Sequence, residues 1–192
     1  MDLHPGDGLL IVDVQNDFLP GGALGVTRGD EVVPVLNLYM AAFNMRGLPI
    51  FASRDWHPAK HCSFREQGGI WPVHCVVGTK GAEFHPDFHL APSTIVISKA
   101  TEPKKEAYSA FQGTTLDEYL RETGVQRLFI GGLATDYCVQ NTVRDAIKRG
   151  YAVCLLMDGI RAVNLKQDDG RKAEEEMIRL GAVPFRLENL AA

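Results

Sequence analysis

The sequence lacks the features that would place it in a membrane, in a secretory pathway or on a nucleic acid. No apolar run approaches the roughly 20 residues that a membrane-spanning helix needs. The first residues, MDLHPGDG, contain no basic segment followed by an apolar stretch. The formal net charge is −4, and the sequence contains no run of lysine and arginine that would bind a nucleic acid. We therefore expect a cytoplasmic protein that binds neither a membrane nor a nucleic acid.

Cysteine is also scarce, with only four in 192 residues. Cys62, Cys75, Cys138 and Cys154 stand far apart, so the pattern does not indicate a small disulfide scaffold, and we expect reduced thiols. The length is sufficient for one domain with a substantial apolar core. We expect a single domain over residues 1–192.

What the sequence does contain is an alternation of short apolar runs and segments with helical spacing. The runs that predict strands lie at residues 9–12, 49–52, 95–97, 128–130, 152–157 and 183–186. The segments that predict helices lie at residues 30–46, 114–123, 136–149 and 168–180. Strands that alternate with helices are typical of βαβ units, so we predict an α/β fold with a parallel sheet.

Residues 54–93 interrupt this alternation. They contain both tryptophans and two of the cysteines but little periodicity. A long irregular stretch inside a domain is usually either functional or disordered. Disorder is disfavoured by the aromatic residues that would be buried, which are Trp56, Phe64, Trp71, Phe84 and Phe88. We predict an ordered loop that contributes to a functional site.

Chemically capable side chains follow four of the predicted strands. These are Asp13, the pair Asp55 and His57, then Lys99, and finally Cys138 after the glycines of GGLATDYC. Ligands of open α/β sheets bind at the carboxyl ends of the strands, which lie at one edge of a parallel sheet. The four groups can therefore converge although they are far apart in the sequence.

Cys138 is a candidate nucleophile within this set. A cysteine attacks as thiolate, whose pKa is about 8.5 in a free side chain, so it needs a base or positive surroundings. Asp13 could be the base, Lys99 could stabilise developing charge, and N–H groups at the start of helix 136–149 could form an oxyanion hole. The same residue types also fit a small buried cysteine, a turn-capping aspartate and a solvated lysine. The residues alone leave both interpretations open.

A second cluster is typical of a metal site. Asp55, His57, His61 and His74 offer one carboxylate and two or three imidazoles, which suit Zn²⁺, Fe²⁺ or Mn²⁺. The spacing matches no fixed motif, so solvent-exposed loop histidines are an equal alternative, and the neighbouring cysteines are possible ligands.

Several segments together resemble the nicotinamidases of the isochorismatase-like cysteine hydrolase superfamily. They occur in the expected order, from about residue 11 to residue 159, as DVQNDFLPGGAL, SRDWHPAKHCSF, WPVHC, SKATEPKKEAYSAFQGT and GLATDYCVQNTVRDA. The resemblance implies a three-layer α/β/α, Rossmann-like fold of the isochorismatase type with a six-stranded, mainly parallel sheet. It also implies hydrolysis of nicotinamide, and commonly of pyrazinamide, to the acid and ammonia through a cysteine thioester, a step of NAD salvage.

The resemblance assigns roles to individual residues. The Asp-Lys-Cys triad of the family falls on Asp13, Lys99 and Cys138. Its cis peptide falls at Leu133–Ala134, and the N–H groups of Ala134 and Cys138 would form the oxyanion hole.

The metal ligands of the family fall on Asp55, His57 and His74, for one divalent ion per chain. Zinc is the first expectation, with iron or manganese as alternatives. His61 matches a histidine that ligates metal only in some members of the family.

The resemblance further implies a pocket for a small flat substrate. Its residues match or neighbour Phe18, Leu24, Trp71, Tyr108, Ala134 and Tyr137. Aromatic rings among them would stack on the substrate ring. The sequence leaves open whether the chain is a monomer or a homo-oligomer.

Three other functions are weighed against nicotinamide hydrolysis. One is a related amidohydrolase acting on another small amide or ureido compound, but such relatives generally lack the metal set at Asp55, His57 and His74. A second is an inactive binding protein of this fold, against which the intact triad counts. The third is a purely structural metal site, which the single carboxylate disfavours.

Overall fold

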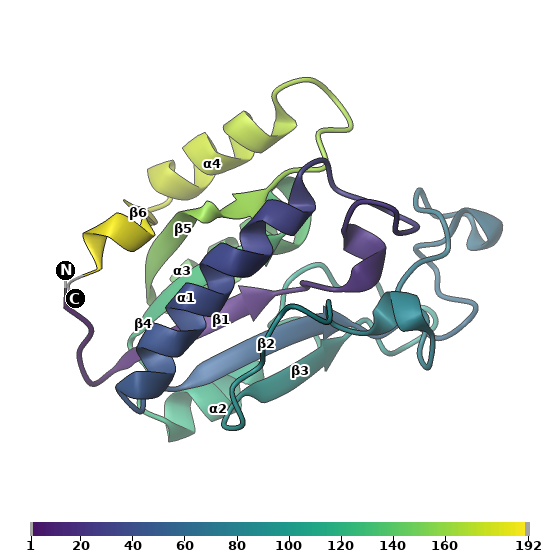
Figure 1. Ribbon diagram of the computed structural model, residues 1–192. Helices are drawn as coiled ribbons and strands as arrows, with labels where there is room; N and C mark the ends of the chain where they lie inside the picture. Colours follow the sequence, from purple (N-terminus) through teal and green to yellow (C-terminus); the bar gives the residue numbers. More distant parts are fainter. Residues whose placement is uncertain (1, 191–192) are drawn as a thin grey trace.

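The computed structural model describes residues 2–190, and a six-stranded sheet forms its centre (Figure 1). The strands are β1 (Asp7–Val12), β2 (Ile50–Asp55), β3 (Ile95–Lys99), β4 (Arg127–Leu133), β5 (Ala152–Arg161) and β6 (Val183–Phe185). They lie in the order β3-β2-β1-β4-β5-β6, and every neighbouring pair is parallel. The predicted α/β fold is therefore confirmed, with a sheet that is wholly rather than mainly parallel. The predicted single domain stays a prediction, and its residues 1 and 191–192 lie outside the described part.

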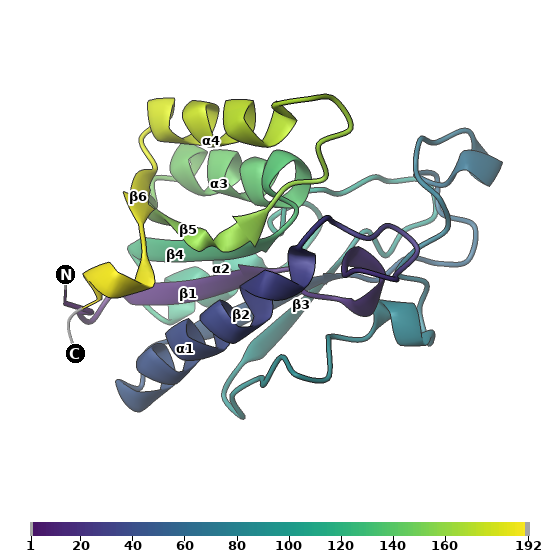
Figure 2. The same cartoon turned by 45° about the horizontal axis from the view of Figure 1, so that its top comes forward.

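Helices cover both faces of the sheet, as the three-layer prediction requires (Figure 2). They are α1 (Val32–Met45), α2 (Leu116–Glu122), α3 (Gln140–Lys148) and α4 (Asp169–Arg179). Successive side chains of a strand point to opposite faces. Leu9 and Ile11 of β1 accordingly belong to the apolar cluster that contains α1, whereas Leu10 and Val12 belong to the cluster with α2 and α3. Burial on both faces explains why β1 reads as a continuous apolar run.

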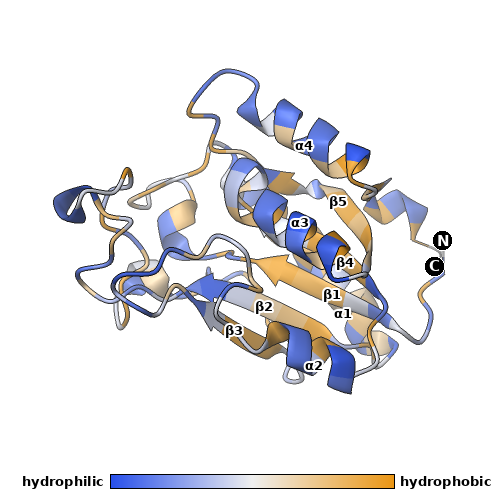
Figure 3. Cartoon of the chain, turned by 180° about the vertical axis from the view of Figure 1, so that it is seen from behind, coloured by the Kyte–Doolittle hydropathy of each residue, from blue (hydrophilic) through white to orange (hydrophobic). Residues whose placement is uncertain are grey.

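The apolar residues concentrate where these layers meet. Figure 3 shows hydrophobic strands beneath helices whose outer sides are hydrophilic. Among residues 2–190, no helix combines the length and the apolar character needed to cross a bilayer. The four cysteines carry free thiols, in line with the expectation of reduced cysteine.

The long segment between β2 and β3 extends beyond the carboxyl edge of the sheet (Figure 1). Its aromatic side chains hold it in place, as the sequence predicts. Phe64, Trp71 and Phe88 are buried, while Trp56 and Phe84 are partly buried and pack against the core. Burial of these aromatic side chains, three of them in or against the main apolar core, anchors the segment.

The order of the strands reverses between β1 and β4, and such a switch point is where doubly wound folds bind ligands. The backbones of β1 and β4 approach each other closely there. Gly132 in β4 has φ +121°, and a Cβ at this position would lie 2.0 Å from the carbonyl oxygen of Val12. Only glycine fits at position 132, so the second glycine of the GGLATDYC segment reflects close packing of β4 on β1.

Four strands run past the carboxyl ends that their apolar runs predict. β4 continues from the predicted end at residue 130 to Leu133. β2 and β3 end at Asp55 and Lys99, which are paired in register, so these polar residues belong to the strands themselves. β5 continues to Arg161, past the predicted end at residue 157. Asp158 is polar but has partners in other elements, since its carboxylate accepts hydrogen bonds from the hydroxyl of buried Tyr39 and from the Leu187 N–H.

Candidate active site

A buried cluster of charged groups lies at the carboxyl ends of β1 to β4. The Nζ atom of Lys99 is at its centre, 2.9 Å from Oδ2 of Asp13 and 3.5 Å from Sγ of Cys138. The same ammonium donates hydrogen bonds to the carboxylate of Asp55 and to the carbonyl oxygen of Ala107. The structure thus brings together the acid, the amine and the thiol that the sequence places on separate strands.

The environment of Lys99 keeps it charged. Burial by itself lowers the pKa of this ammonium, but the carboxylates of Asp13 and Asp55 outweigh burial and raise the pKa well above its ordinary value. Burial likewise opposes ionisation of Asp55, yet the positive charge of Lys99 lowers the pKa of the Asp55 carboxyl overall. Lys99 and Asp55 therefore form an ion pair within the buried site.

Asp13 and Cys138 are placed for proton transfer. One oxygen of Asp13 accepts a 2.7 Å hydrogen bond from the Ser53 hydroxyl, whereas its other oxygen accepts no hydrogen bond of good geometry within residues 2–190. A carboxylate oxygen of Asp13 and the Cys138 sulfur lie within 4.8 Å of each other. Burial raises the pKa of both groups, and the nearby carboxylates raise the pKa of the thiol further. A neutral thiol beside the Asp13 carboxylate, whose Oδ2 lies 2.9 Å from the Lys99 ammonium, is an arrangement suited to general-base activation.

Cys138 lies in a wide helical turn rather than in an α-helix. The prediction of one helix over residues 136–149 is wrong at this point, because residues Thr135–Val139 form a π-helical turn and α3 begins only at Gln140. The Ala134 carbonyl accepts the N–H groups of both Tyr137 and Val139, which widens the turn. Such turns are frequent at functional sites. The peptide bond Leu133–Ala134 before it is cis, as the resemblance predicts.

Next to this cluster, three side chains are arranged as a cation site. Asp55, His57 and His74 each offer a ligand atom, and these atoms lie within 4.8 Å of one another. Neither ring nitrogen of buried His57 has a hydrogen-bond partner among the described residues. His74 pairs its Nδ1 with the Pro72 carbonyl at 2.8 Å, which assigns the proton to Nδ1 and leaves Nε2 as a ligand atom.

The protonation state of His74 also suits a cation. Burial lowers the pKa of His74, which favours the neutral imidazole that metals bind. Buried nitrogens without partners are costly unless something binds them. The donor set of one carboxylate and two imidazoles therefore fits a divalent metal ion.

His61 is not brought into this group. Its ring nitrogens are bonded to the Ser63 hydroxyl at 2.7 Å and to the Lys105 carbonyl at 3.0 Å. Its ring packs on that of His57, with 4.2 Å between centroids. In the described residues neither Cys62 nor Cys75 joins the candidate ligand groups.

Gln15 supports the site in a way that sequence reasoning missed. Its buried side-chain amide donates to the carbonyl oxygens of Asp55 at 2.7 Å and Ala82 at 2.9 Å, and it accepts the Asp55 N–H at 2.8 Å. The backbone of β1 pairs with β2 only as far as Ser53, opposite Val12. The Gln15 side chain therefore takes the place of the next β1 peptide and fixes the position of Asp55. The motif DVQNDF signals a polar residue here but not its partner.

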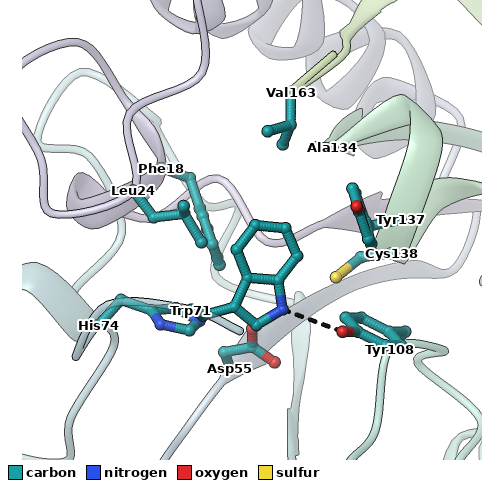
Figure 4. A pocket seen from close by; sticks show the side chains of 10 residues that line it. All are labelled: Phe18, Leu24, Asp55, Trp71, His74, Tyr108, Ala134, Tyr137, Cys138 and Val163. Carbon is teal, nitrogen blue, oxygen red and sulfur yellow. Dashed lines mark hydrogen bonds between the residues drawn. The ribbon is translucent and has the colours of Figure 1, made fainter. Parts of the chain in front are cut away.

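A small pocket opens onto Cys138 (Figure 4). Its lining contains all six residues predicted for a substrate pocket, which are Phe18, Leu24, Trp71, Tyr108, Ala134 and Tyr137. The indole N–H of Trp71 donates to the Tyr108 hydroxyl at 2.9 Å, and the ring of Tyr137 packs edge-on against Trp71. Asp55 and His74 also line the pocket, so the cation group faces the same space as the thiol. Val163 is a further lining residue, and no sequence pattern indicates it.

Taken together, the strand order and the buried Asp-Lys-Cys cluster at the switch point define a doubly wound α/β protein with a cysteine-centred site. The model of the isochorismatase domain matches residues 7–187, so the chain belongs to the isochorismatase family. This finding confirms the resemblance noted in the sequence.

The relatives of the chain agree with this family. A nicotinamidase of Escherichia coli strain K12 is 41% identical, over 95% of this chain and 96% of the relative. The structure of a pyrazinamidase from Pyrococcus horikoshii in complex with zinc superposes with a TM-score of 0.91 at 49% identity, covering 95% of this chain and 100% of that one. A structure from L. infantum in complex with nicotinate gives a TM-score of 0.89 at 36% identity, with 98% and 96% coverage.

Proposed function

We propose that this chain is a nicotinamidase, which hydrolyses nicotinamide to nicotinate and ammonia in NAD salvage and also accepts pyrazinamide. The observation that carries the proposal is the contact of Lys99 with both Asp13 and Cys138 at the base of an aromatic pocket. The nicotinamidase and pyrazinamidase names of similar chains support the choice of substrate.

The proposed reaction begins with proton transfer from Cys138 to Asp13. The thiolate then attacks the carboxamide carbon, and the carbonyl electrons move to oxygen. When the tetrahedral intermediate collapses, the C–N bond breaks, and Asp13 returns the proton to the leaving nitrogen, so that ammonia departs and a thioester remains. Asp13 then takes a proton from water, and the hydroxide attacks the thioester carbon. The C–S bond breaks, the sulfur takes the proton back from Asp13, and the nicotinic acid that is released ionises to nicotinate.

Charge that develops on the substrate oxygen needs stabilisation. The backbone N–H groups of Ala134 and Cys138 are proposed to supply it, since both residues line the pocket beside the sulfur. Lys99 has a different role. Its ammonium holds Asp13 in place and offsets the negative charge of the Cys138 thiolate.

The cation group has a distinct role in the proposal. Asp55, His57 and His74 would hold one divalent ion, zinc first and iron or manganese as alternatives, and the zinc complex of a similar pyrazinamidase supports this order. When bound, the ion supplies a Lewis acid that can accept a lone pair from a ring nitrogen of the substrate. His74 and Asp55 line the pocket, so they direct that ring nitrogen to one side and the carboxamide to Cys138.

The shape of the pocket fits a flat ring. Phe18, Trp71 and Tyr137 present aromatic surfaces, and the Trp71–Tyr108 hydrogen bond fixes the indole. An aromatic amide would bury its faces against these rings. Small ureido or carbamoyl compounds, the substrates of the alternative amidohydrolase, lack both the aromatic ring and the ring nitrogen.

An ammonia-release assay tests the proposal. The panel should contain nicotinamide, pyrazinamide, benzamide and a ureido compound, each measured with and without a chelator. We expect hydrolysis of the first two, slower turnover of benzamide because it lacks the ring nitrogen, and loss of activity with chelator. Preferential hydrolysis of the ureido compound would contradict the proposal and favour the alternative.

A further inference from the structure

One carboxylate joins the segment of the nucleophile to the loop that follows β5. The two oxygens of Asp136 accept the backbone N–H groups of Val163 at 2.9 Å and Asn164 at 2.8 Å. Asp136 lies in the π-helical turn that contains Cys138. The carboxylate of Asp136 therefore fixes the start of the β5–α4 loop relative to the sulfur.

The same loop is also held from its other side. The Asn164 side-chain carbonyl accepts the N–H of Gly170, at the beginning of α4, at 2.8 Å. A Cβ at Gly170 would lie 2.5 Å from the Cβ of Ala162, so the loop and the helix are in direct contact. The Asp136 carboxylate and the Asn164 side chain thus fix the part of the loop that contains Val163.

Val163 presents its side chain to the pocket. Figure 4 shows it at the end of the pocket away from Asp55 and His74, with Cys138 between these two ends. A nicotinamide ring held by its nitrogen at the cation group and by its carboxamide at Cys138 would turn its remaining edge, carbons C4 and C5, toward Val163. A substituent on that edge would meet the two methyl groups of Val163 in this pose.

From this geometry we infer that Val163 is a specificity-determining residue that excludes nicotinamides substituted on the edge opposite to the ring nitrogen, and that Asp136 is the positioning residue that holds it. The inference rests on the proposed nicotinamidase function and deepens it. It identifies the acceptable substrates as small nitrogen heteroaromatic amides with an unsubstituted C4–C5 edge.

The test compares kcat/KM for 4-methyl- and 5-methylnicotinamide with kcat/KM for nicotinamide, in wild type and in Val163→Ala. A pocket that gains or loses one methyl group typically discriminates by about 10-fold or more. We expect Val163→Ala to raise the ratio by roughly that factor. The ratio for 6-methylnicotinamide, whose methyl lies beside the ring nitrogen, should not change.

The positioning role needs its own pair of variants. Asp136→Asn replaces one of the two acceptor oxygens by an NH₂ group and should raise the same ratio, by less than Val163→Ala. Asp169→Asn is the matched control, since the Asp169 carboxylate accepts the Lys166 N–H at 2.9 Å in the same loop but does not contact Val163. This control should leave the ratio unchanged.

The outcomes separate the inference from the function on which it rests. Wild type that hydrolyses nicotinamide, together with a Val163→Ala ratio equal to wild type, overturns the inference alone. An equal change in Asp136→Asn and Asp169→Asn overturns the positioning role, because it would reflect general loosening of the loop. Wild type that hydrolyses no nicotinamide overturns both the inference and the proposed function.

Discussion

The Nζ atom of Lys99 lies 2.9 Å from Oδ2 of Asp13, although their strands, β3 and β1, are separated by β2. Neither side chain is exposed to solvent at all. The lysine reaches across the end of the intervening strand, where Asp55 accepts a hydrogen bond from the same ammonium. A buried charge that loses its partner destabilises the fold, so the site depends on Lys99, Asp13 and Asp55 together.

Removal of the amine should therefore destabilise the fold as well as the reaction. Lys99→Met leaves the carboxylates of Asp13 and Asp55 buried without their cation, and breaking a buried pair costs about 3–5 kcal/mol. We expect the free energy of unfolding in urea to fall by this amount and ammonia release to be lost. Lys105→Met is the control, because the ion pair of Lys105 with Glu102 is exposed. Equal stability of Lys99→Met and wild type would show that the buried pair is not required.

A cation bound by Asp55, His57 and His74 should be lost when one ligand is removed. His57→Ala deletes an imidazole that makes no side-chain hydrogen bond within the described residues, although its Nε2 lies 3.5 Å from Oδ2 of Asp55. We expect metal content by elemental analysis to fall to background and nicotinamide turnover to fall with it. His89→Ala, in the same segment but exposed, should retain its metal. Unchanged metal content in His57→Ala would refute the ligand assignment.

Much of the site could be predicted because it depends on residue types at strand ends. In a parallel sheet the carboxyl ends share one edge, so Asp13, Lys99 and Cys138 converge whatever the intervening sequence. The resemblance to a family then assigned their roles. The function of Gln15 was not predictable, because it depends on where the backbone of β1 stops pairing with β2, which no local pattern reveals.

Gln15 provides a test of this backbone support. Gln15→Met keeps the length of the side chain but leaves the Asp55 N–H and two carbonyl groups without partners. Each buried group without a partner costs about 1–3 kcal/mol. We expect weaker zinc binding in a chelator competition, with activity partly restored at high zinc. Asn16→Ala removes a comparable hydrogen bond to Lys80 at an exposed position and should not alter zinc binding. Lower stability with unchanged zinc affinity would limit Gln15 to a structural role.

An ion pair at the beginning of α1 should make the stability of the fold depend on pH in the acid range. Hydrogen bonds from Arg28 and Arg161 lower the pKa of Glu31 to about 2, from an ordinary value of 4.5. A lowered pKa in the folded state stabilises the protein above the ordinary value, and this contribution is lost as the pH falls from 4.5 toward 2. Glu31→Gln should therefore lower Tm at neutral pH and lower it less in acid. An equal difference in Tm at both pH values would contradict the assigned cause.

Val163 shows a second limit of the sequence. The apolar run of β5 ends at Met157, and the following Asp158 and Gly159 are typical of a turn. The strand nevertheless continues to Arg161, because Asp158 finds partners in α1 and in the segment after β6. Such partners are distant in sequence, so the strand end that presents Val163 to the pocket could not be located beforehand.

The central claim is that the sulfur of Cys138 forms the bond to the substrate carbonyl. The most direct test is ammonia release from nicotinamide by Cys138→Ala, at a protein concentration where wild type gives a strong signal and with circular dichroism to verify the fold. The mechanism predicts a folded protein whose ammonia release equals the enzyme-free background. Turnover at a rate comparable to wild type would contradict it, because the thioester could not form.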